Sequence, residues 1–363
     1  MNQSILILTN NIGGLHSFRK EVVKAIVDAG CKVYISEPDD DVRVRYFESI
    51  GCQIIKTSFN RRGMNPFADF KLLLTYLRLI RRIHPAAVLT YTIKPNIYGG
   101  IAARWERVPQ LANITGLGDA IENPGFLSKL TIALYRLGLR KTRTVFYQNT
   151  SIEEFCKKHG IAGHGRLLPG SGVNLDWHTI KPYPAEGSRM KFNFIGRVLK
   201  DKGIEEFIRM AQTIRSKYPF TEFHILGDCE DAYETQLRGL QKDGTIVWHG
   251  AVTDVRPYIE DSYATIHPSY HEGMANVILE TCAAGRPVIA CNINGCKEAI
   301  DDGVNGFLCR VRDAVDLAEK VERFIMLPYE RKVQMGLNAR EKMKREFDRK
   351  IVIEAYLEEI EDI

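Results

Sequence analysis

The most constraining feature of the sequence is a regular alternation of short apolar segments with longer amphipathic segments. An apolar strand is predicted at residues 4–9, followed by a turn at Gly13 and Gly14 and by a helix at about residues 17–29. Alternation of this kind is typical of a parallel sheet with helices on both faces. Further strands are predicted at residues 32–36, 86–90, 110–114 and 144–148.

The alternation stops at residues 169–184, a stretch rich in Gly and Pro without a periodic apolar pattern, and then restarts. Such a composition is typical of a linker. A helix predicted at residues 276–284 is followed by Gly285 and Pro287, which mark a helix end. The other elements predicted in this half are strands at residues 191–195, 222–226, 245–249, 264–267 and 287–290, and a helix at residues 204–215.

The fold class predicted from this pattern is α/β, with two doubly wound Rossmann-like domains that face a central cleft. A chain of 363 residues is long enough for two such domains. We expect an N-terminal domain at residues 1–168 and a C-terminal domain at residues 169–345, because the linker begins between them. Ligands of parallel sheets bind beyond the carboxyl ends of the strands, so functional residues are expected there.

Charge is distributed unevenly along the chain. Through Arg166, Lys and Arg outnumber Asp and Glu by 24 to 13, whereas the remainder has 26 basic and 32 acidic residues. A basic half indicates an anionic partner, and nucleic acid, a phosphorylated substrate and an anionic membrane all fit. The eight cysteines include no Cys-x-x-Cys pair, and no signal peptide or spanning helix is recognisable, so we expect a cytoplasmic protein with reduced cysteines.

The most informative segment joins a predicted strand to the helix that begins near Asn276. Its loop carries Glu272, and Glu280 lies more than one turn inside the helix. The first turn of a helix exposes N–H groups that attract an anion such as a diphosphate, and the small residues Gly273 and Ala275 let a ligand approach the backbone. The two carboxylates can therefore bracket a sugar nucleotide, whose hydroxyl groups lie on both sides of its diphosphate.

No metal site is expected from the sequence. His271 and Glu272 begin a His-Glu-x-x-His zinc signature, but Ala275 stands where the second His would be. No Asp-x-Asp pattern follows an apolar strand, and the acidic run at residues 39–41 is typical of a solvated loop.

The spacing of Glu272 and Glu280 resembles the donor-binding signature of family-4 glycosyltransferases, which have the GT-B fold. Other segments are similar to that family in the same order along essentially the whole chain. They are residues 170–174, residues 194–197, Lys202 with Gly203, residues 294–298 and residues 302–307. The resemblance implies a retaining, metal-independent hexosyltransferase without a cofactor.

The resemblance also implies roles for individual residues. Arg197 and Lys202 would hold the donor diphosphate, and with Glu272 they are the expected catalytic residues. Glu280 would bind the ribose hydroxyls, and Glu272 would contact the transferred sugar near its anomeric carbon. The further residues expected to bind the donor are Gly13, Gly14, Gly196, Gly273, Met274, Ala275 and Asn276.

The N-terminal half departs from the family pattern, because its loop after residues 110–114 lacks the His that many relatives place near the anomeric centre. Residues 91–96 and 113–123 resemble a subgroup that acts on polyprenyl-diphosphate-linked sugars in surface polysaccharide or glycan assembly. The resemblance implies a nucleotide-sugar donor, UDP-linked as in many of these relatives, and a lipid-diphosphate-linked sugar or another glycan as the acceptor. The acceptor-side candidates remain open between His16, Lys94, Asn113, Thr115, Asp119 and Glu122.

Two helical segments that are both apolar and basic, residues 71–82 and 129–143, indicate peripheral contact with an anionic membrane at the inner face of the plasma membrane. The same pattern also fits ordinary helices that pack on a sheet and expose basic side chains. A C-terminal helix at about residues 346–363 is expected to pack on the N-terminal domain, as the resemblance implies.

A sugar-nucleotide epimerase, similar to UDP-N-acetylglucosamine 2-epimerase, is the alternative function, because an epimerase of the same fold would use the donor site without an acceptor. The basic and apolar N-terminal half favours the transferase. No zinc finger and no strand motif of aromatic and basic residues supports nucleic-acid binding, so no nucleic-acid partner is expected.

Overall fold

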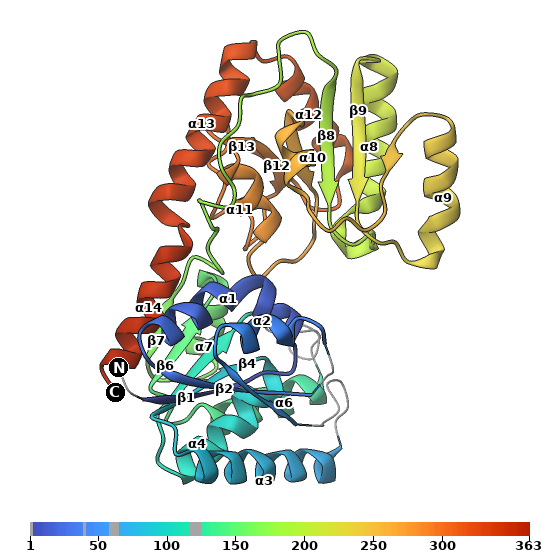
Figure 1. The fold of residues 1–363 in the computed structure, drawn as a ribbon. Coiled ribbons are helices and arrows are strands. Elements are labelled where there is room, and N and C mark those ends of the chain that lie inside the picture. Colours follow the sequence, from blue (N-terminus) through green and yellow to red (C-terminus); the bar gives the residue numbers. More distant parts are fainter. Residues whose placement is uncertain (1–2, 39–40, 58–64, 117–124) are drawn as a thin grey trace. The chain divides into compact units, whose positions relative to one another are not determined.

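The computed structural model of the chain describes residues 3–38, 41–57, 65–116 and 125–363, and it divides into two compact units (Figure 1). One unit contains residues 1–171 together with residues 350–363, and the other contains residues 172–349. Each unit is built on a parallel sheet with helices on both faces. The predicted α/β class is therefore confirmed.

The first unit has a sheet of seven strands in the described part of the chain. Its strands are β1 (Ser4–Leu8), β2 (Lys32–Glu37), β3 (Gln53–Lys56), β4 (Ala87–Tyr91), β5 (Gln110–Ile114), β6 (Thr144–Tyr147) and β7 (Gly165–Leu167). They lie in the order β3-β2-β1-β4-β5-β6-β7, and all neighbours are parallel.

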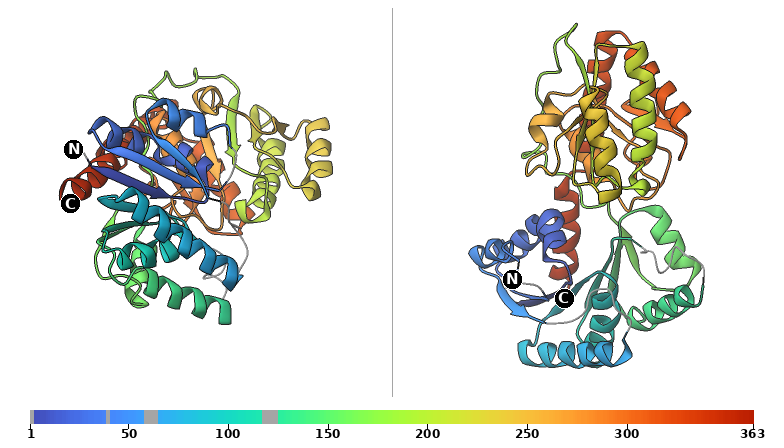
Figure 2. Two further views of the ribbon diagram at one scale, coloured as in Figure 1. Left: turned by 60° about the horizontal axis from the view of Figure 1, so that its bottom comes forward. Right: turned by 90° about the vertical axis from the view of Figure 1, so that its right-hand side faces the viewer.

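Helices cover both faces of this sheet. They are α1 (Ile12–Asp28), α2 (Val44–Ser49), α3 (Pro66–Ile83), the π-helix η1 (Pro95–Gly99), α4 (Gly100–Trp105), α6 (Phe126–Gly138), α7 (Thr150–Lys158) and α14 (Arg349–Glu361). Helices α3, α4, α6 and α7 contribute to the core on one face, and α1, α2 and α14 contribute to the core on the other (Figures 1 and 2).

The second unit has six parallel strands in the order β10-β9-β8-β11-β12-β13. Its strands are β8 (Met190–Ile195), β9 (Thr221–Leu226), β10 (Val247–Trp248), β11 (Ala264–His267), β12 (Val288–Cys291) and β13 (Gly306–Cys309). Its helices are η2 (Lys200–Lys202), α8 (Ile204–Lys217), α9 (Asp231–Lys242), α10 (Arg256–Glu260), α11 (Asn276–Ala283), α12 (Ala314–Ile325) and α13 (Tyr329–Glu346). Helices α8, α9 and α12 pack on one face, whereas α11 and α13 pack on the other.

Side-chain caps explain where several helices begin. Asn11 Oδ1 accepts a hydrogen bond from Gly14 N at 2.9 Å, and Asn149 Oδ1 accepts one from Ile152 N at 2.8 Å. Because Asn11 caps α1, this helix begins at Ile12 rather than near residue 17. The prediction that Gly13 and Gly14 form a turn before the helix is therefore wrong, since both lie in its first turn.

Each strand predicted from the sequence corresponds to an observed strand, although β10 is shorter than its predicted range. Strands β3, β7 and β13 were not predicted. The predicted basic helix at residues 129–143 begins earlier and ends at Gly138, so its last basic residues follow α6 rather than lie on it.

Helix α14 brings the last residues of the chain into the core of the first unit. Tyr356 is fully buried there, and its ring stacks on Phe146 with 4.4 Å between ring centroids. Its hydroxyl accepts a hydrogen bond from Arg19 Nε at 3.3 Å and donates one to Asn113 Oδ1. Tyr356 therefore joins α1, β5 and β6 through one side chain.

We expect Tyr356→Phe to lower the free energy of unfolding by about 1–3 kcal/mol, because the buried polar groups of Arg19 and Asn113 lose a partner. Chemical denaturation measures this change. The exposed Glu354 on the same helix provides the control, and Glu354→Gln should change stability by less than about 0.5 kcal/mol. Equal stability of Tyr356→Phe and the unmodified protein would contradict the assignment.

Candidate active site

The segments that follow β8 and β11 contact each other at the carboxyl edge of the second sheet. The two strands are parallel neighbours, so their following segments start side by side. Tyr270 N donates a hydrogen bond to Asp201 O at 2.9 Å, and the Tyr270 hydroxyl lies 2.8 Å from both carboxylate oxygens of Glu206. These contacts fix the loop of residues 268–275 against η2 and the start of α8.

Gly203 permits this close approach. Its φ angle is 74°, and a Cβ atom at this position would lie 2.1 Å from the carbonyl oxygen of Pro268. Any other residue would have to displace the loop backbone. It would also need a positive φ angle, which residues other than Gly rarely adopt. The absence of a side chain at Gly203 therefore lets Lys202 lie beside the loop that carries Glu272.

The Glu272 carboxylate is held through one of its two oxygens. Lys202 Nζ donates to Glu272 Oε1 at 2.5 Å, and His267 Nε2 lies 2.9 Å from the same oxygen. Among the described residues no group donates a hydrogen bond to Oε2. The Glu272 side chain is 13% exposed. One oxygen is therefore held by the protein, and the other is open to a ligand.

Burial alone would raise the pKa of Glu272. The hydrogen bonds and positive charges of His267 and Lys202 outweigh burial and lower this pKa to about 2. Glu272 is consequently ionised at neutral pH. An ionised carboxylate in this position can accept hydrogen bonds from sugar hydroxyls and can stabilise positive charge that develops at a reacting carbon.

The N-terminus of α11 lies at the end of the same loop. Its cap residue is Ala275, and no described side chain accepts a hydrogen bond from its first turn, which also lacks an acidic residue. Asn276 Oδ1 is buried without a hydrogen-bond partner in the described part of the chain. Open N–H groups at a helix start favour an anion. The predicted diphosphate position is therefore compatible with the local geometry.

Glu280 lies on the second turn of α11 and is partly buried. Burial raises its pKa to about 7, and the charge of Arg349 opposes this effect in part. The carboxylate makes no hydrogen bond with a described residue. Burial of a charged group without hydrogen bonds is unfavourable, and ligand hydroxyls at this position would relieve the cost. The predicted ribose-binding role is consistent with this environment.

Arg197 follows β8 and is exposed. Its guanidinium makes neither an ion pair nor a hydrogen bond within the described residues. Lys202, in contrast, is paired with Glu272. The structure thus brings Lys202 and Glu272 together and leaves Arg197 available to an external anion.

The other predicted donor residues of this unit differ in accessibility. Gly196 directly follows β8, and Gly273 is partly buried. Met274 is 7% exposed and packs in the core beneath α11 with Ala275, which is 3% exposed. Met274 and Ala275 can therefore offer a ligand little beyond their backbone groups.

Two of the predicted acceptor residues have partners within the first unit. Lys94 Nζ donates to Asp69 Oδ1 at 2.7 Å, and Tyr98 donates to Asp69 Oδ2 at 3.0 Å. Asn113 is 2% exposed, and its Nδ2 donates to Thr90 O at 3.3 Å. These contacts favour structural roles for Lys94 and Asn113 in the packing around η1 and β5.

The remaining candidates of the first unit have mixed environments. Thr115 is exposed directly after β5, whereas Asp119 and Glu122 lie outside the described residues. His16 is half-buried against the ring of Tyr46, with 5.1 Å between ring centroids. Burial and the positive charges of Lys20 and Arg43 lower its pKa. Among these candidates, Thr115 and His16 remain accessible to a ligand.

Gly13 and Gly14 lie at the start of α1. A Cβ atom at Gly13 would lie 2.4 Å from Arg43 Nη1, so the guanidinium of Arg43 covers this residue. Arg43 is itself paired with Asp41 through two hydrogen bonds. The small size of Gly13 therefore makes room for an arginine side chain, an explanation that needs no ligand.

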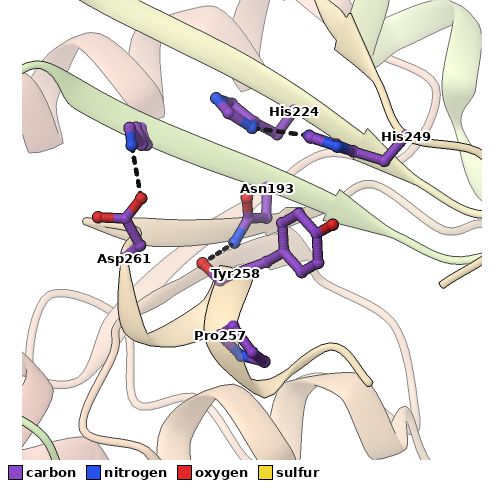
Figure 3. A pocket seen from close by; sticks show the side chains of 7 residues that line it. Asn193, His224, His249, Pro257, Tyr258 and Asp261 are labelled. Atoms are coloured by element: carbon purple, nitrogen blue, oxygen red, sulfur yellow. Dashed lines mark hydrogen bonds and ion pairs between the residues drawn. The ribbon is translucent and has the colours of Figure 1, made fainter. Parts of the chain in front are cut away.

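A cavity of about 300 Å³ lies along β8, β9 and α10, and it contains none of the predicted site residues (Figure 3). It is lined by Lys191, Asn193, His224, His249, Pro257, Tyr258 and Asp261. Most of its polar side chains already pair with protein groups. His224 Nδ1 lies 3.0 Å from His249 Nε2, Asn193 Nδ2 donates to Tyr258 O at 2.8 Å, and Lys191 pairs with Asp261. We assign no ligand to this cavity.

The described residues hold neither a metal-binding cluster nor a membrane-spanning helix. No group of three His, Cys, Asp or Glu side chains in the described ranges is placed to hold a metal ion. No helix of the described part of the chain is both long enough and apolar enough to cross a bilayer.

Two family models match the chain, one in each half. Residues 5–149 match the model described as glycosyl transferase 4-like, and residues 189–326 match the model described as glycosyl transferases group 1. The chain therefore belongs to the family-4 glycosyltransferases. The comparisons give no support to the epimerase alternative.

Two relatives extend along most of the chain. The N,N'-diacetylbacillosaminyl-diphospho-undecaprenol alpha-1,3-N-acetylgalactosaminyltransferase of Campylobacter jejuni is 23% identical over 94% of each chain. The capsular polysaccharide biosynthesis glycosyltransferase CapM of Staphylococcus aureus is 24% identical over 81% of each chain. The resemblance to enzymes of polysaccharide and lipid-linked glycan assembly is thereby confirmed.

Solved structures confirm the GT-B fold. Anabaena HepE in complex with UDP and glucose has a TM-score of 0.78 at 16% identity, with 99% of this chain and 100% of HepE covered. A glycosyltransferase from Rickettsia africae has a TM-score of 0.82 at 18% identity, with 99% of this chain and 98% of the other chain covered.

The raised pKa of Glu280 predicts a pH-dependent effect of Glu280→Gln on stability. A carboxyl with a raised folded-state pKa favours folding below its unfolded pKa, and this advantage is lost as pH rises through about 7. We therefore expect a gain of less than about 1 kcal/mol at pH 5 and a gain on the order of 1–3 kcal/mol at pH 8. Denaturation at both pH values measures the difference.

The exposed Glu319 on α12 provides the matched control. Glu319→Gln should leave the pH dependence of stability unchanged. A stability change in Glu280→Gln that is the same at pH 5 and pH 8 would mean that Glu280 is not held in an unfavourable environment.

Proposed function

We propose that the protein is a retaining, metal-independent glycosyltransferase of surface polysaccharide assembly. It transfers a hexose or an N-acetylhexosamine from a UDP-linked donor to a lipid-diphosphate-linked sugar or another glycan. The observation that carries the proposal is the contact between Lys202 and Glu272 beside the open N-terminus of α11. This arrangement combines groups suited to a diphosphate with a carboxylate suited to a sugar.

The chemistry depends on charge at the leaving group. Cleavage of the sugar–phosphate bond leaves negative charge on the diphosphate, and Arg197, Lys202 and the first N–H groups of α11 would stabilise it. Glu272 Oε2 would accept a hydrogen bond from a hydroxyl of the transferred sugar. Glu280 would accept hydrogen bonds from the ribose. Because positive side chains and backbone N–H groups neutralise the charge, this scheme requires no metal ion.

Relatives support the assignment of both substrates. HepE was solved in complex with UDP and glucose, which favours a UDP-linked donor for this chain of the same fold. The Campylobacter jejuni relative is named for transfer of N-acetylgalactosamine to a sugar on diphospho-undecaprenol, which favours an acceptor on a lipid diphosphate. The donor domain of this proposal is residues 169–345, and the acceptor domain is residues 1–168.

Donor binding provides the test. UDP at one hundred times its Kd should stabilise the folded protein by about 2.7 kcal/mol, and thermal shift across UDP-, GDP-, ADP- and CMP-sugars identifies the preferred base. Arg197→Ala and Lys202→Ala should each weaken UDP binding by at least about tenfold, because each removes a charge-assisted contact to phosphate. The anomeric configuration of the transferred sugar, determined by NMR, tests retention.

Lys200 provides a matched control, since it is an exposed lysine on the same short helix and lies two residues from Lys202. Lys200→Ala should leave UDP binding unchanged. Equal effects of Lys200→Ala and Lys202→Ala would show that the diphosphate is not bound at this site. Interconversion of the donor sugar in the absence of an acceptor would contradict the transferase proposal.

We also propose that the first unit associates peripherally with an anionic membrane at the inner face of the plasma membrane. Helices α3 and α6 both pack on η1, and each presents an aromatic side chain at its N-terminal end. Phe67 is 88% exposed and Phe126 is 83% exposed. Exposed aromatic residues beside basic helix faces are typical of interfacial contact. The basic residues exposed on these helices are Lys71, Arg78, Arg81, Arg82, Lys129 and Arg136.

We expect Phe67→Ser combined with Phe126→Ser to reduce sedimentation with vesicles of anionic phospholipid by at least about tenfold, because apolar area leaves the interface. Phe220, which is 47% exposed in the second unit, provides the control through Phe220→Ser. Higher salt should weaken binding of the unmodified protein through its basic residues. Unchanged sedimentation of the double variant would contradict this contact surface.

A further inference from the structure

The two groups that hold Glu272 differ in how firmly they are placed. His267 is the last residue of β11, is 5% exposed, and lies opposite Ala290 in the parallel register of β11 and β12. Lys202 lies on the three-residue helix η2, and its side chain is 24% exposed. The imidazole therefore projects from a strand inside the sheet, whereas the lysine reaches Glu272 from the protein surface on a flexible side chain.

Lys202 has two competing partners under the proposed function. In the structure its ammonium pairs with Glu272 Oε1, and during catalysis it would hold the donor diphosphate. A diphosphate carries more negative charge than a carboxylate and would draw the ammonium toward itself. Glu272 would then lose one of its two hydrogen-bond donors while remaining largely buried. The remaining hydrogen-bond donor to Glu272 is His267, whose Nε2 lies 2.9 Å from Oε1.

We propose that His267 is a positioning residue that holds Glu272 in place when the donor diphosphate engages Lys202. This inference rests on the proposed function. His267 acts through Glu272 rather than on the substrate, because it contacts Oε1 and leaves Oε2 open to a sugar hydroxyl. The interaction needs a proton on His267 Nε2, which both the neutral Nε2–H tautomer and the imidazolium provide.

The proposal has a consequence for the pH dependence of catalysis. Lys202 and His267 together oppose the effect of burial on Glu272 in the free protein. Without His267, Glu272 still pairs with Lys202 in the free protein. In the donor complex Lys202 would instead hold the diphosphate, so Glu272 would lack both of its hydrogen-bond donors. The pH profile of kcat reports pKa values in the donor complex, and that of kcat/KM reports those of the free protein. Loss of His267 should therefore raise the apparent pKa of the acid limb more in the kcat profile than in the kcat/KM profile.

The experiment compares His267→Leu, His267→Gln and His267→Asn in transfer assays with a UDP-sugar donor across pH 4.5–9, together with UDP binding by calorimetry. We expect His267→Leu to lower kcat by about 10–100-fold and to raise the apparent pKa of the acid limb of the kcat profile. Its UDP affinity should stay within about twofold of that of the unmodified protein. Gln can place an N–H near the position of Nε2, so His267→Gln should recover most of the activity. Asn is too short and should not.

His271 in the same loop is exposed, and His271→Leu provides the control with unchanged kinetics. If His267→Leu does not fold, the comparison of Gln with Asn replaces it, and equal activity of these two variants would overturn the inference. An unchanged kcat and pH profile in His267→Leu would also overturn it. Absence of both transfer and UDP binding in the unmodified protein would instead refute the proposed function.

Discussion

The contact between the backbones that follow β8 and β11 is the constraint on which the candidate site depends. The hydrogen bond from Tyr270 N to Asp201 O and the close approach at Gly203 place η2 against the loop that carries Glu272. This contact places Lys202 beside Glu272, although 70 residues separate them in sequence. The order of the sheet makes the contact possible, since β8 and β11 are direct neighbours although β9 and β10 intervene along the chain.

Most of the fold could be predicted because its central strands are apolar runs flanked by recognisable turns. Two of the three strands that were not predicted, β3 and β7, lack such a pattern. β3 places two apolar residues between polar ones, and β7 has only three residues. The start of α1 was missed for a different reason. Two glycines normally argue against a helix, but the Asn11 side chain caps this one by accepting a hydrogen bond from Gly14 N. The guanidinium of Arg43 occupies the space that a side chain at Gly13 would need.

The candidate site could be predicted in its residue types but not in its internal contacts. The spacing of Glu272 and Glu280 and the family resemblance pointed to both carboxylates, and the resemblance also pointed to Lys202. Nothing in the sequence indicated that a histidine at the end of β11 would share an oxygen of Glu272 with Lys202. A His five residues before a signature Glu was the only available signal, and its meaning depends on the turn of the loop between them. The pairing of Lys94 with Asp69 likewise depends on helix packing that a linear pattern does not encode.

The discontinuous composition of the first unit has a consequence for synthesis on the ribosome. Residues 172–349 form one compact unit from a continuous stretch, whereas the unit that starts the chain also includes residues 350–363. Val352, Ala355, Tyr356 and Ile360 of α14 belong to the core beneath β1 and β4. Domains fold as units during vectorial synthesis. The first unit therefore cannot complete its core until residues 350–363 have been translated, whereas residues 172–349 of the second unit are already complete by then.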